Sequence, residues 1–541
     1  MKIIKTLKDN WQICCTLVVF LIIKSYFAFT RYRLPIWDES VYVGIGKYIF
    51  SFGHSGLWEI IRPLGLPIIT GLLWIMGIKT NVTTAYYEFV MLLFSCAFIL
   101  MVYVVAKEIF NKKVAIISSI LCAVAPLFFL YSGYILTEIP SAVFVLLAIY
   151  TYVRKKYLAA GIFSGIAFMF KFPQGIILAI LLATLILYAA YEYITKNSVN
   201  NKNNNNINNK TDKKKISKTK ASKFLAKKIY KDVFSKALLI TIGFLIIVVP
   251  FLIFNYAMYH SYTGTITDAV FRPMILAAPH QSNPFDSIIT NSFLLKLYNI
   301  FYYIIVMAKD YWIFGLFIPA LLFLVYRIYQ SHIKRKLSEN QLSIIIATIL
   351  YLLYWSIISN KQDRFFIVML PFVAMITAYL IWSIFDSRFD SKINMALFII
   401  IAVFTLVATL TAMGFDVSYY TWRPALNNKP EIITGLYQQP DMIGVNGSIL
   451  ITDPVFAIFT DKKILPYYFS VQGQVVFFNE WEKDDTIGAV EFNANSLSCM
   501  PQDTVCLEKK KQLLLSVENQ YTLVFNKTYY DTPYYIFIPK K

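Results

Sequence analysis

Two adjacent carboxylates, Asp38 and Glu39, directly follow the first strongly apolar stretch of the chain, in the segment RLPIWDESVYVGIGKYIF (33–50). A carboxylate beside a hydroxyl group can accept its proton as a general base. Acidic side chains are also favoured in the first turn of a helix, where the helix dipole is positive. Both interpretations are open at this stage, and the first requires further polar groups nearby.

Four other ionisable residues lie near the ends of apolar stretches. Arg and Lys can hold a phosphate, Arg through two hydrogen bonds and Lys as a point charge. Such cations would also stabilise the charge that develops on a phosphate leaving group. The simpler alternative for each cation is an aliphatic stem along the membrane and a charge among the lipid headgroups. The four residues are Arg62 in IIRPLGLP, Glu138 in YSGYILTEIP, Lys171 in GIAFMFKFPQG and Arg364 in NKQDRFFIVMLPF.

Membrane-spanning helices are the elements that would position these residues. The chain is 57% hydrophobic, whereas soluble domains are roughly 45–50% apolar. Apolar runs of the length that a bilayer requires predict a polytopic α-helical membrane protein with about eleven spans. The shorter apolar run 64–78 predicts a juxtamembrane or re-entrant helix. The predicted spans are 11–30, 83–106, 114–131, 138–153, 158–171, 173–195, 235–256, 311–329, 342–358, 365–384 and 393–414.

Basic clusters between the apolar runs predict the topology. They lie at the N-terminus and in alternate loops, so the positive-inside rule places the N-terminus in the cytoplasm. The loops 31–82 and 257–310 then face outward, and all six candidate residues lie on that side, where they would line one polar cavity. These clusters also account for the net charge of +20, so nucleic acid is not an expected partner. The low-complexity basic segment 196–234 predicts a disordered cytoplasmic loop.

The pattern changes after the last predicted span. Short alternating segments such as GSILITDPVFAIF and QYTLVFNKTYYDTPYYIFI predict strands with turns between them. Residues 415–541 are therefore expected to form a small α/β domain outside the cell, after a transmembrane domain of residues 1–414. Cys499 and Cys506 lie in this tail and could form a disulfide or remain two thiols.

Metal binding finds little support in the sequence. His54, His260 and His280 lie in predicted outward loops, but their spacing matches no compact metal motif. We assign no metal ligands, and the cofactor stays open between none and a divalent metal.

The ordered set WDESVY, RPLGLP, YILTEIP, GIAFMFKFP and DRFFIVMLPFVA resembles the dolichyl-phosphate-mannose–protein mannosyltransferase-like family, which includes the aminoarabinose lipid A transferases. The resemblance covers roughly residues 1–410 in order and spacing and implies a GT-C type fold. It implies a glycosyltransferase, hexosyl or pentosyl, that moves a sugar from a polyprenyl-phosphate donor to a protein, lipid or glycan acceptor outside the cell. The enzyme would be a multi-pass protein of the cell membrane, in contact with its lipids.

The resemblance also implies roles for individual residues. Asp38 matches the catalytic base, and Glu39 completes an Asp-Glu pair and would position acceptor or donor. The three cations, Arg62, Lys171 and Arg364, would contact the donor and its phosphate. Glu138 stands where the family usually has Asp, so it counts as a catalytic candidate with an open role. Ile61-Arg62 replaces the Glu-Lys of aminoarabinose-type relatives, which puts a metal site built on that Glu in doubt.

A transporter or a flippase for lipid-linked sugars is the main alternative. Such proteins often contain two similar halves, with polar residues near the bilayer midplane. This sequence shows no internal repeat of that kind, and its candidate residues gather near one rim of the predicted membrane domain.

Overall fold

The computed structural model describes residues 10–30, 34–59, 61–78, 84–205, 213–266, 292–310, 312–333, 338–358, 361–386, 433–466, 486–493, 504–529 and 532–540. The chain forms two units. Unit 1 comprises Met1–Leu21, Phe94–Ser132 and Thr137–Phe415, and unit 2 comprises Ile22–Leu93, Gly133–Leu136 and Asp416–Lys541. The predicted last span, 393–414, lies outside the described residues.

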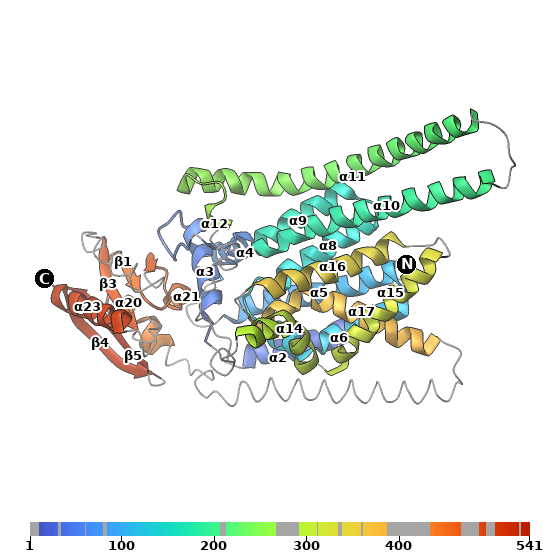
Figure 1. Ribbon diagram of the computed structural model, residues 1–541. Helices are drawn as coiled ribbons and strands as arrows, with labels where there is room; N and C mark the ends of the chain where they lie inside the picture. Colours follow the sequence, from blue (N-terminus) through green and yellow to red (C-terminus); the bar gives the residue numbers. More distant parts are fainter. Residues whose placement is uncertain are drawn as a thin grey trace. The chain divides into compact units, whose positions relative to one another are not determined.

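Long apolar helices dominate the described part of the chain, which confirms the predicted helical membrane class (Figure 1). Four shorter apolar helices correspond to the predicted helix at 64–78 and to the predicted spans 138–153, 158–171 and 365–384; they are α4 (Gly65–Ile75), α8 (Glu138–Val153), α9 (Tyr157–Phe170) and Leu370–Phe385 of α17 (Leu370–Asp386). Among the described residues, six helical stretches are long and apolar enough to cross a membrane: α2 (Trp11–Thr30), α5 (Ala85–Ile109), Phe172–Thr195, Ala226–Met258, Ile313–Gln330 and α16 (Glu339–Ile357).

Some predicted elements have different bounds in the structure. The predicted span 114–131 is divided into α6 (Lys112–Ala123) and α7 (Pro126–Tyr131), because Pro126 lacks an N–H group and starts a new helix in its first turn. The predicted span 365–384 begins as a 3₁₀-helix, η4 (Asp363–Val368), ahead of α17. Helix also replaces disorder in much of the segment 196–234, since α10 (Ile176–Asn205) and α11 (Lys213–Tyr259) extend into it.

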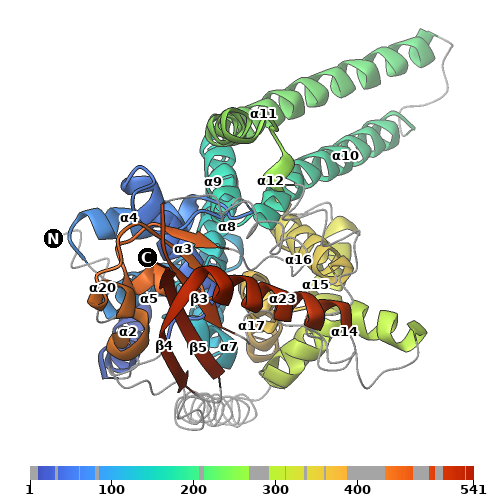
Figure 2. The ribbon, with the colours of Figure 1, turned by 90° about the vertical axis from the view of Figure 1, so that its left-hand side faces the viewer.

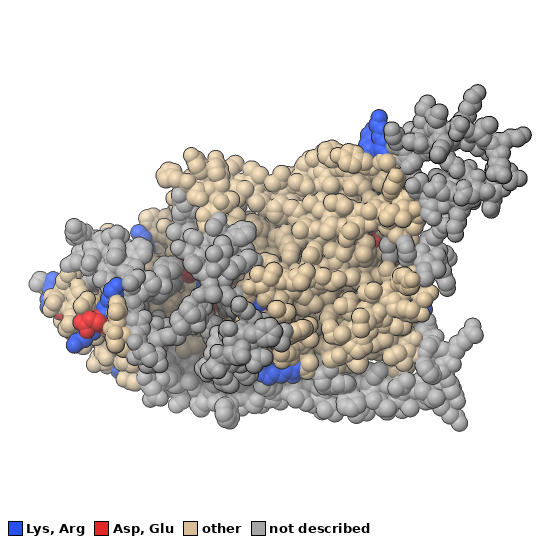
Figure 3. Space-filling model, in the orientation of Figure 1, with Lys and Arg blue, Asp and Glu red and all other residues tan. Residues whose placement is uncertain are grey.

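Small residues bring α9 and α11 of unit 1 into close contact, and the two helices lie side by side in Figures 1 and 2. A Cβ at Gly161 of α9 would lie 2.0 Å from the carbonyl oxygen of Ile240, and one at Gly243 of α11 would lie 2.2 Å from that of Leu158. Gly161 and Gly165 have the spacing with which small residues let membrane helices approach. In this part of unit 1, Figure 3 shows a face over α9, α10 and α16 with few charged side chains.

The remaining described helices of unit 1 comprise three short elements and two longer α-helices. The short elements are η1 (Phe172–Gly175), α12 (Gly264–Ile266) and η3 (Trp312–Leu316), and the longer helices are α14 (Ser292–Asp310) and α15 (Phe317–Ile333).

In unit 2, α3 (Trp37–Phe50) packs against α4, the short helix that the sequence predicts at 64–78. A Cβ at Gly46 would lie 2.5 Å from Thr70 Oγ1 and 2.6 Å from the backbone nitrogen of Gly71. Thr70 Oγ1 donates a hydrogen bond to the Tyr42 carbonyl oxygen (3.0 Å). Glycine at position 46 therefore sets how closely the two helices approach.

The C-terminal part of unit 2 is a mixed five-stranded sheet, which confirms the predicted α/β class. The strand order is β2-β1-β3-β5-β4. On this sheet, Leu513 and Val517 of one helix, α23, pack against Leu450, Val490 and Phe537 (Figure 2). The elements are η5 (Ile433–Tyr437), α20 (Gln439–Met442), parallel β1 (Ser448–Ile451), α21 (Phe456–Phe459), parallel β2 (Ile464–Pro466) and β3 (Ile487–Asn493), α23 (Thr504–Gln520), and antiparallel β4 (Tyr521–Tyr529) and β5 (Thr532–Pro539).

Cys499 lies outside the described residues, so a disulfide to Cys506 and two free thiols remain the two alternatives.

Candidate functional site

Glu39 fastens the beginning of α3. Its Oε2 accepts a hydrogen bond from the backbone N–H of Ile36 (2.8 Å), the residue that caps the helix. Its Oε1 accepts one from the backbone N–H of Ile135 (2.7 Å), and the side chain is fully buried. These contacts favour a positioning role for Glu39, in which the carboxylate holds α3 itself.

Asp38 points into a different set of contacts. Its Oδ1 lies 2.9 Å from Nη2 of Arg62, and both side chains are 19% exposed. The same guanidinium contacts Oε1 of Glu59 through Nε at 3.0 Å and lies over the ring of Tyr42, with Cζ 5.6 Å from its centroid. Arg62 therefore joins two carboxylates, one buried and one partly exposed, and sets the orientation of Asp38.

Glu59 is absent from the residues that the sequence predicts for the site. It lies in the loop between α3 and α4, three positions before Arg62, in WEIIRP. An acid three positions before a candidate cation could have indicated this pair in the sequence, because a single turn of the chain brings side chains at that spacing close together. Glu59 is buried, so an unpartnered carboxylate would be costly there and a cation nearby is expected.

The other predicted residues form a second group, in unit 1. Glu138 is the first residue of α8, and its Oε1 lies 2.7 Å from Nζ of Lys171 and 3.5 Å from Nε of Arg364. Lys171 follows α9 in extended backbone, and Arg364 lies in η4. Two cations thus share one carboxylate oxygen, so these three side chains together carry one positive charge.

Aromatic rings lie beneath the two cations. Nζ of Lys171 is 4.0 Å from the ring centroid of Phe365 and 5.5 Å from that of Trp355, and these two rings stack at 4.7 Å. The Nε of Arg364 also donates a hydrogen bond to Oε1 of Gln362 (2.6 Å). Ring faces attract cations without neutralising them. The rings of Phe365 and Trp355 therefore hold the positive charge in place, and the charge can still attract an anion.

The nearby Lys361 has a structural explanation. Its Nζ donates hydrogen bonds to the carbonyl oxygens of Trp355 (2.6 Å) and Ser356 (2.9 Å), in the last turn of α16. Cations are favoured at that end of a helix. Burial lowers the pKa of the Lys361 ammonium to about 8, and its charge is directed to the helix end.

The structure therefore brings Asp38 together with Arg62, and Glu138 together with Lys171 and Arg364, whereas Glu39 takes a separate helix-capping position. The single outward cavity for all six residues stays a prediction. Within the described ranges, no group of three or more His, Cys, Asp or Glu side chains is placed to hold a metal ion. His280 lies outside these ranges.

Comparisons with known proteins agree with this architecture. The model of the family "Dolichyl-phosphate-mannose-protein mannosyltransferase" matches residues 67–200. No curated protein matches the sequence.

Solved structures with a similar fold are membrane glycosyltransferases of the GT-C type. ArnT from Cupriavidus metallidurans, bound to undecaprenyl phosphate, has a TM-score of 0.58 at 11% identity, covering 98% of this chain and 97% of its own. The Archaeoglobus fulgidus oligosaccharyltransferase, tethered to an acceptor peptide, has a TM-score of 0.57 at 15% identity, covering 99% of this chain and 74% of its own. The resemblance inferred from the sequence motifs is thus confirmed, and the chain has the GT-C fold.

Proposed function

We propose, on the basis of this GT-C fold and its two charged groups, that the chain is a membrane glycosyltransferase. It would transfer a sugar from a polyprenyl-phosphate-linked donor to a protein, lipid or glycan outside the cell. The observation that carries the proposal is the contact between Asp38 and Arg62 (2.9 Å), because it joins a candidate base to a candidate phosphate ligand. Among the similar structures, ArnT is bound to undecaprenyl phosphate and the archaeal oligosaccharyltransferase is in complex with a dolichol-phosphate, which supports a lipid-linked donor.

The proposed step is a single displacement at the anomeric carbon. The acceptor hydroxyl oxygen forms the new bond to that carbon, and its proton passes to the Asp38 carboxylate as general base. The bond between the anomeric carbon and the phosphate oxygen breaks, and its electron pair leaves with the polyprenyl phosphate. Arg62 orients Asp38 and contacts the phosphate, whose developing charge is the part of the reaction that cations stabilise.

Lys171 and Arg364 are proposed as further ligands of the donor phosphate. Glu138 keeps the two cations, which would otherwise repel each other, on one carboxylate oxygen. Glu39 is proposed to act indirectly, by holding the beginning of α3. The proposed step uses protein side chains alone, since the described His, Cys, Asp and Glu side chains form no group that could hold a metal ion.

The proposed topology places the N-terminus in the cytoplasm and the C-terminal sheet outside the cell. The support is the distribution of Lys and Arg along the sequence. Cysteine labelling from either side of sealed cells, at an introduced cysteine in the C-terminal sheet, tests this arrangement.

The central experiment supplies membranes with radiolabelled polyprenyl-phosphate sugars and identifies the labelled product. Asp38→Asn should abolish transfer while the protein still inserts, because asparagine cannot accept the proton. Asp232→Asn is the matched control, since this exposed carboxylate of α11 pairs with Lys236 one turn along the same helix. Transfer by Asp38→Asn at the wild-type rate would refute the assigned base. Movement of labelled lipid across the membrane by the wild-type protein, without any labelled acceptor, would instead favour the flippase.

A further inference from the structure

A buried lysine joins α3 to the C-terminal sheet within unit 2. Lys47 lies in the last turn of α3 and is 2% exposed. Its Nζ lies 2.6 Å from the carbonyl oxygen of Ile458, 3.0 Å from that of Thr460 and 3.3 Å from Oδ1 of Asp461. An ammonium group carries three donors, and burying it without acceptors would be strongly unfavourable. Three acceptors at and directly after the end of α21 therefore bind this one side chain.

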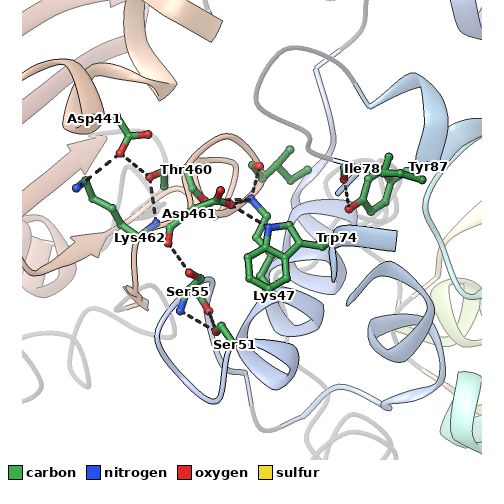
Figure 4. A network of polar contacts seen from close by, with 11 residues as sticks. Lys47, Ser51, Ser55, Trp74, Ile78, Tyr87, Asp441, Thr460, Asp461 and Lys462 are labelled. Atoms are coloured by element: carbon green, nitrogen blue, oxygen red, sulfur yellow. Dashed lines mark hydrogen bonds and ion pairs between the residues drawn. The ribbon is translucent and has the colours of Figure 1, made fainter. Parts of the chain in front are cut away.

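Asp461 is the residue on which the contacts converge (Figure 4). Besides Lys47, its Oδ1 accepts a hydrogen bond from Nε1 of Trp74 (3.0 Å), near the end of α4. Its backbone carbonyl accepts one from Oγ of Ser55, in the loop after α3. Three successive parts of the N-terminal segment thus contact the same residue of the C-terminal segment.

Backbone pairing reinforces this connection. The N–H of Gly56 donates to the Lys462 carbonyl (2.9 Å), and the N–H of Ile464 donates to the Gly56 carbonyl (2.7 Å), which extends the sheet beyond its edge strand β2. Gly56 has a φ of +76°, and a Cβ there would lie 2.2 Å from the Gly44 carbonyl oxygen. Only glycine suits this position, where the loop is held between α3 and the sheet.

These contacts fix the end of α3 opposite to the candidate base. Asp38 lies in the first turn and Lys47 nine positions later, which is about 13.5 Å along a helix axis. Glu39 holds the beginning through Ile36 and Ile135. A rigid rod held at both ends has a fixed direction, whereas one held at a single end can swing.

We propose that Lys47 and Asp461 are positioning residues for Asp38. They fix α3 to the C-terminal sheet, so this sheet belongs to the catalytic unit and is more than an attached accessory domain. The inference rests on the proposed function of Asp38. It concerns where α3 is held, and donor affinity through Lys171 and Arg364 should therefore be unaffected.

The test combines exchange and kinetics on the full chain in lipid nanodiscs. Lys47→Met and Asp461→Asn should speed hydrogen exchange of the α3 backbone amides by about tenfold or more, because freed elements open locally. The same variants should lower kcat for sugar transfer by about tenfold with the donor KM within about twofold, the signature of misplaced catalytic groups. Asp461→Glu, which retains the charge, should recover part of the loss.

Asp441→Asn is the matched control. Asp441 lies in the same network, where it accepts a hydrogen bond from Oγ1 of Thr460 (3.1 Å) and lies 3.7 Å from Nζ of Lys462. Its substitution should leave α3 exchange and kcat at wild-type values. If Lys47→Met does not fold, Asp461→Asn decides, since Asp461 is 42% exposed and its change leaves both carbonyl acceptors of Lys47 in place.

Two outcomes would overturn the inference: wild-type exchange in α3 of both variants, or wild-type kcat in an active preparation of either. Absence of transfer by the wild-type protein would overturn the proposed function. In that case the exchange measurement still decides whether Lys47 and Asp461 hold α3.

Discussion

The guanidinium of Arg62 lies between two carboxylates, 2.9 Å from Oδ1 of Asp38 through Nη2 and 3.0 Å from Oε1 of Glu59 through Nε. Glu59 is buried, and Asp38 is partly exposed. The buried acid therefore orients the arginine, and the arginine orients the acid proposed to do the chemistry. This order of dependence predicts how substitutions should rank.

Arg62→Lys should reduce kcat/KM by about 10- to 150-fold, the range of one lost charge-assisted hydrogen bond of about 1.5–3 kcal/mol. Lysine presents a single nitrogen and cannot reproduce the fork that reaches both acids. Glu59→Gln should have a smaller effect, because its amide oxygen still accepts from Nε. Arg154→Lys, in the exposed pair with Glu108, serves as control. Initial rates over a range of donor concentrations provide the measurement, and equal rates for Arg62→Lys and wild type would contradict the assigned role.

Lys171→Met should raise the donor KM by about tenfold or more while kcat changes less, since the lysine would bind phosphate in the ground state and the transition state alike. Because Lys171 is largely buried, moderate salt should screen this interaction only weakly. Equilibrium binding of polyprenyl phosphate to the wild type and to Lys171→Met, at two ionic strengths, measures the loss of affinity and its dependence on salt. Lys113→Met removes another lysine that lies over an aromatic ring, that of Trp382, and should leave binding unchanged. Equal affinities in the two variants would exclude Lys171 as a phosphate ligand.

A buried acid pair in the C-terminal sheet makes its stability depend on pH. Oε2 of Glu491 accepts hydrogen bonds from the backbone N–H groups of Thr452 (2.8 Å) and Asp453 (3.1 Å). Burial, followed by the charge of Asp453, raises the pKa of Glu491 to about 8. Burial also raises the pKa of Asp453 to about 6. The folded sheet therefore retains protons that the unfolded chain releases near pH 4.

The sign follows from proton linkage. Where the folded state binds more protons than the unfolded state, the free energy of unfolding falls as pH rises. The contribution of this pair is thus fully present below about pH 4 and is lost progressively up to about pH 8. Glu491→Gln should flatten this slope and stabilise the sheet at pH 8.5, as shown by slower proteolysis of the C-terminal segment. Glu518→Gln, an exposed acid on α23, should retain the slope, and a slope equal to wild type in Glu491→Gln would exclude the pair as its source.

Gly161→Val should destabilise unit 1 by about 1–3 kcal/mol, the usual cost of overpacking. A Cβ at this position would lie 2.0 Å from the backbone oxygen of Ile240, and α11 can yield only by moving as a whole. Thermal unfolding in detergent should show a lower Tm. At Gly315 a Cβ would meet nothing within 4 Å, so Gly315→Ala should keep the wild-type Tm. A Tm for Gly161→Val equal to that of the control would argue against close packing of α9 and α11.

The apolar helices could be predicted from the sequence because hydrophobic length is a local property. The two charged groups were partly predictable as well, since a charge at the end of an apolar segment requires a partner or a ligand. The break between α6 and α7 is indicated locally by Pro126, but the continuous hydrophobicity of 114–131 led to the prediction of a single span. Lys47 is different, because the sequence shows only an ordinary helical lysine. Two of its partners are backbone carbonyls without a sequence signature, and the third, Asp461, lies far along the chain. Glu491 is hidden for the same reason, because it accepts from backbone groups about 40 positions away.

Lys47 is synthesised 411 positions before the Ile458 carbonyl that receives it. At translation rates of roughly 5–20 residues per second, the interval is about 20–80 s. During that interval the helices on either side of α3 can enter the membrane, but Lys47 at the end of α3 still lacks its acceptor groups. If the contacts at the end of α3 position Asp38, transfer can begin only after this late contact has formed. A chain that stops before Ile458 would then insert into the membrane but catalyse no transfer.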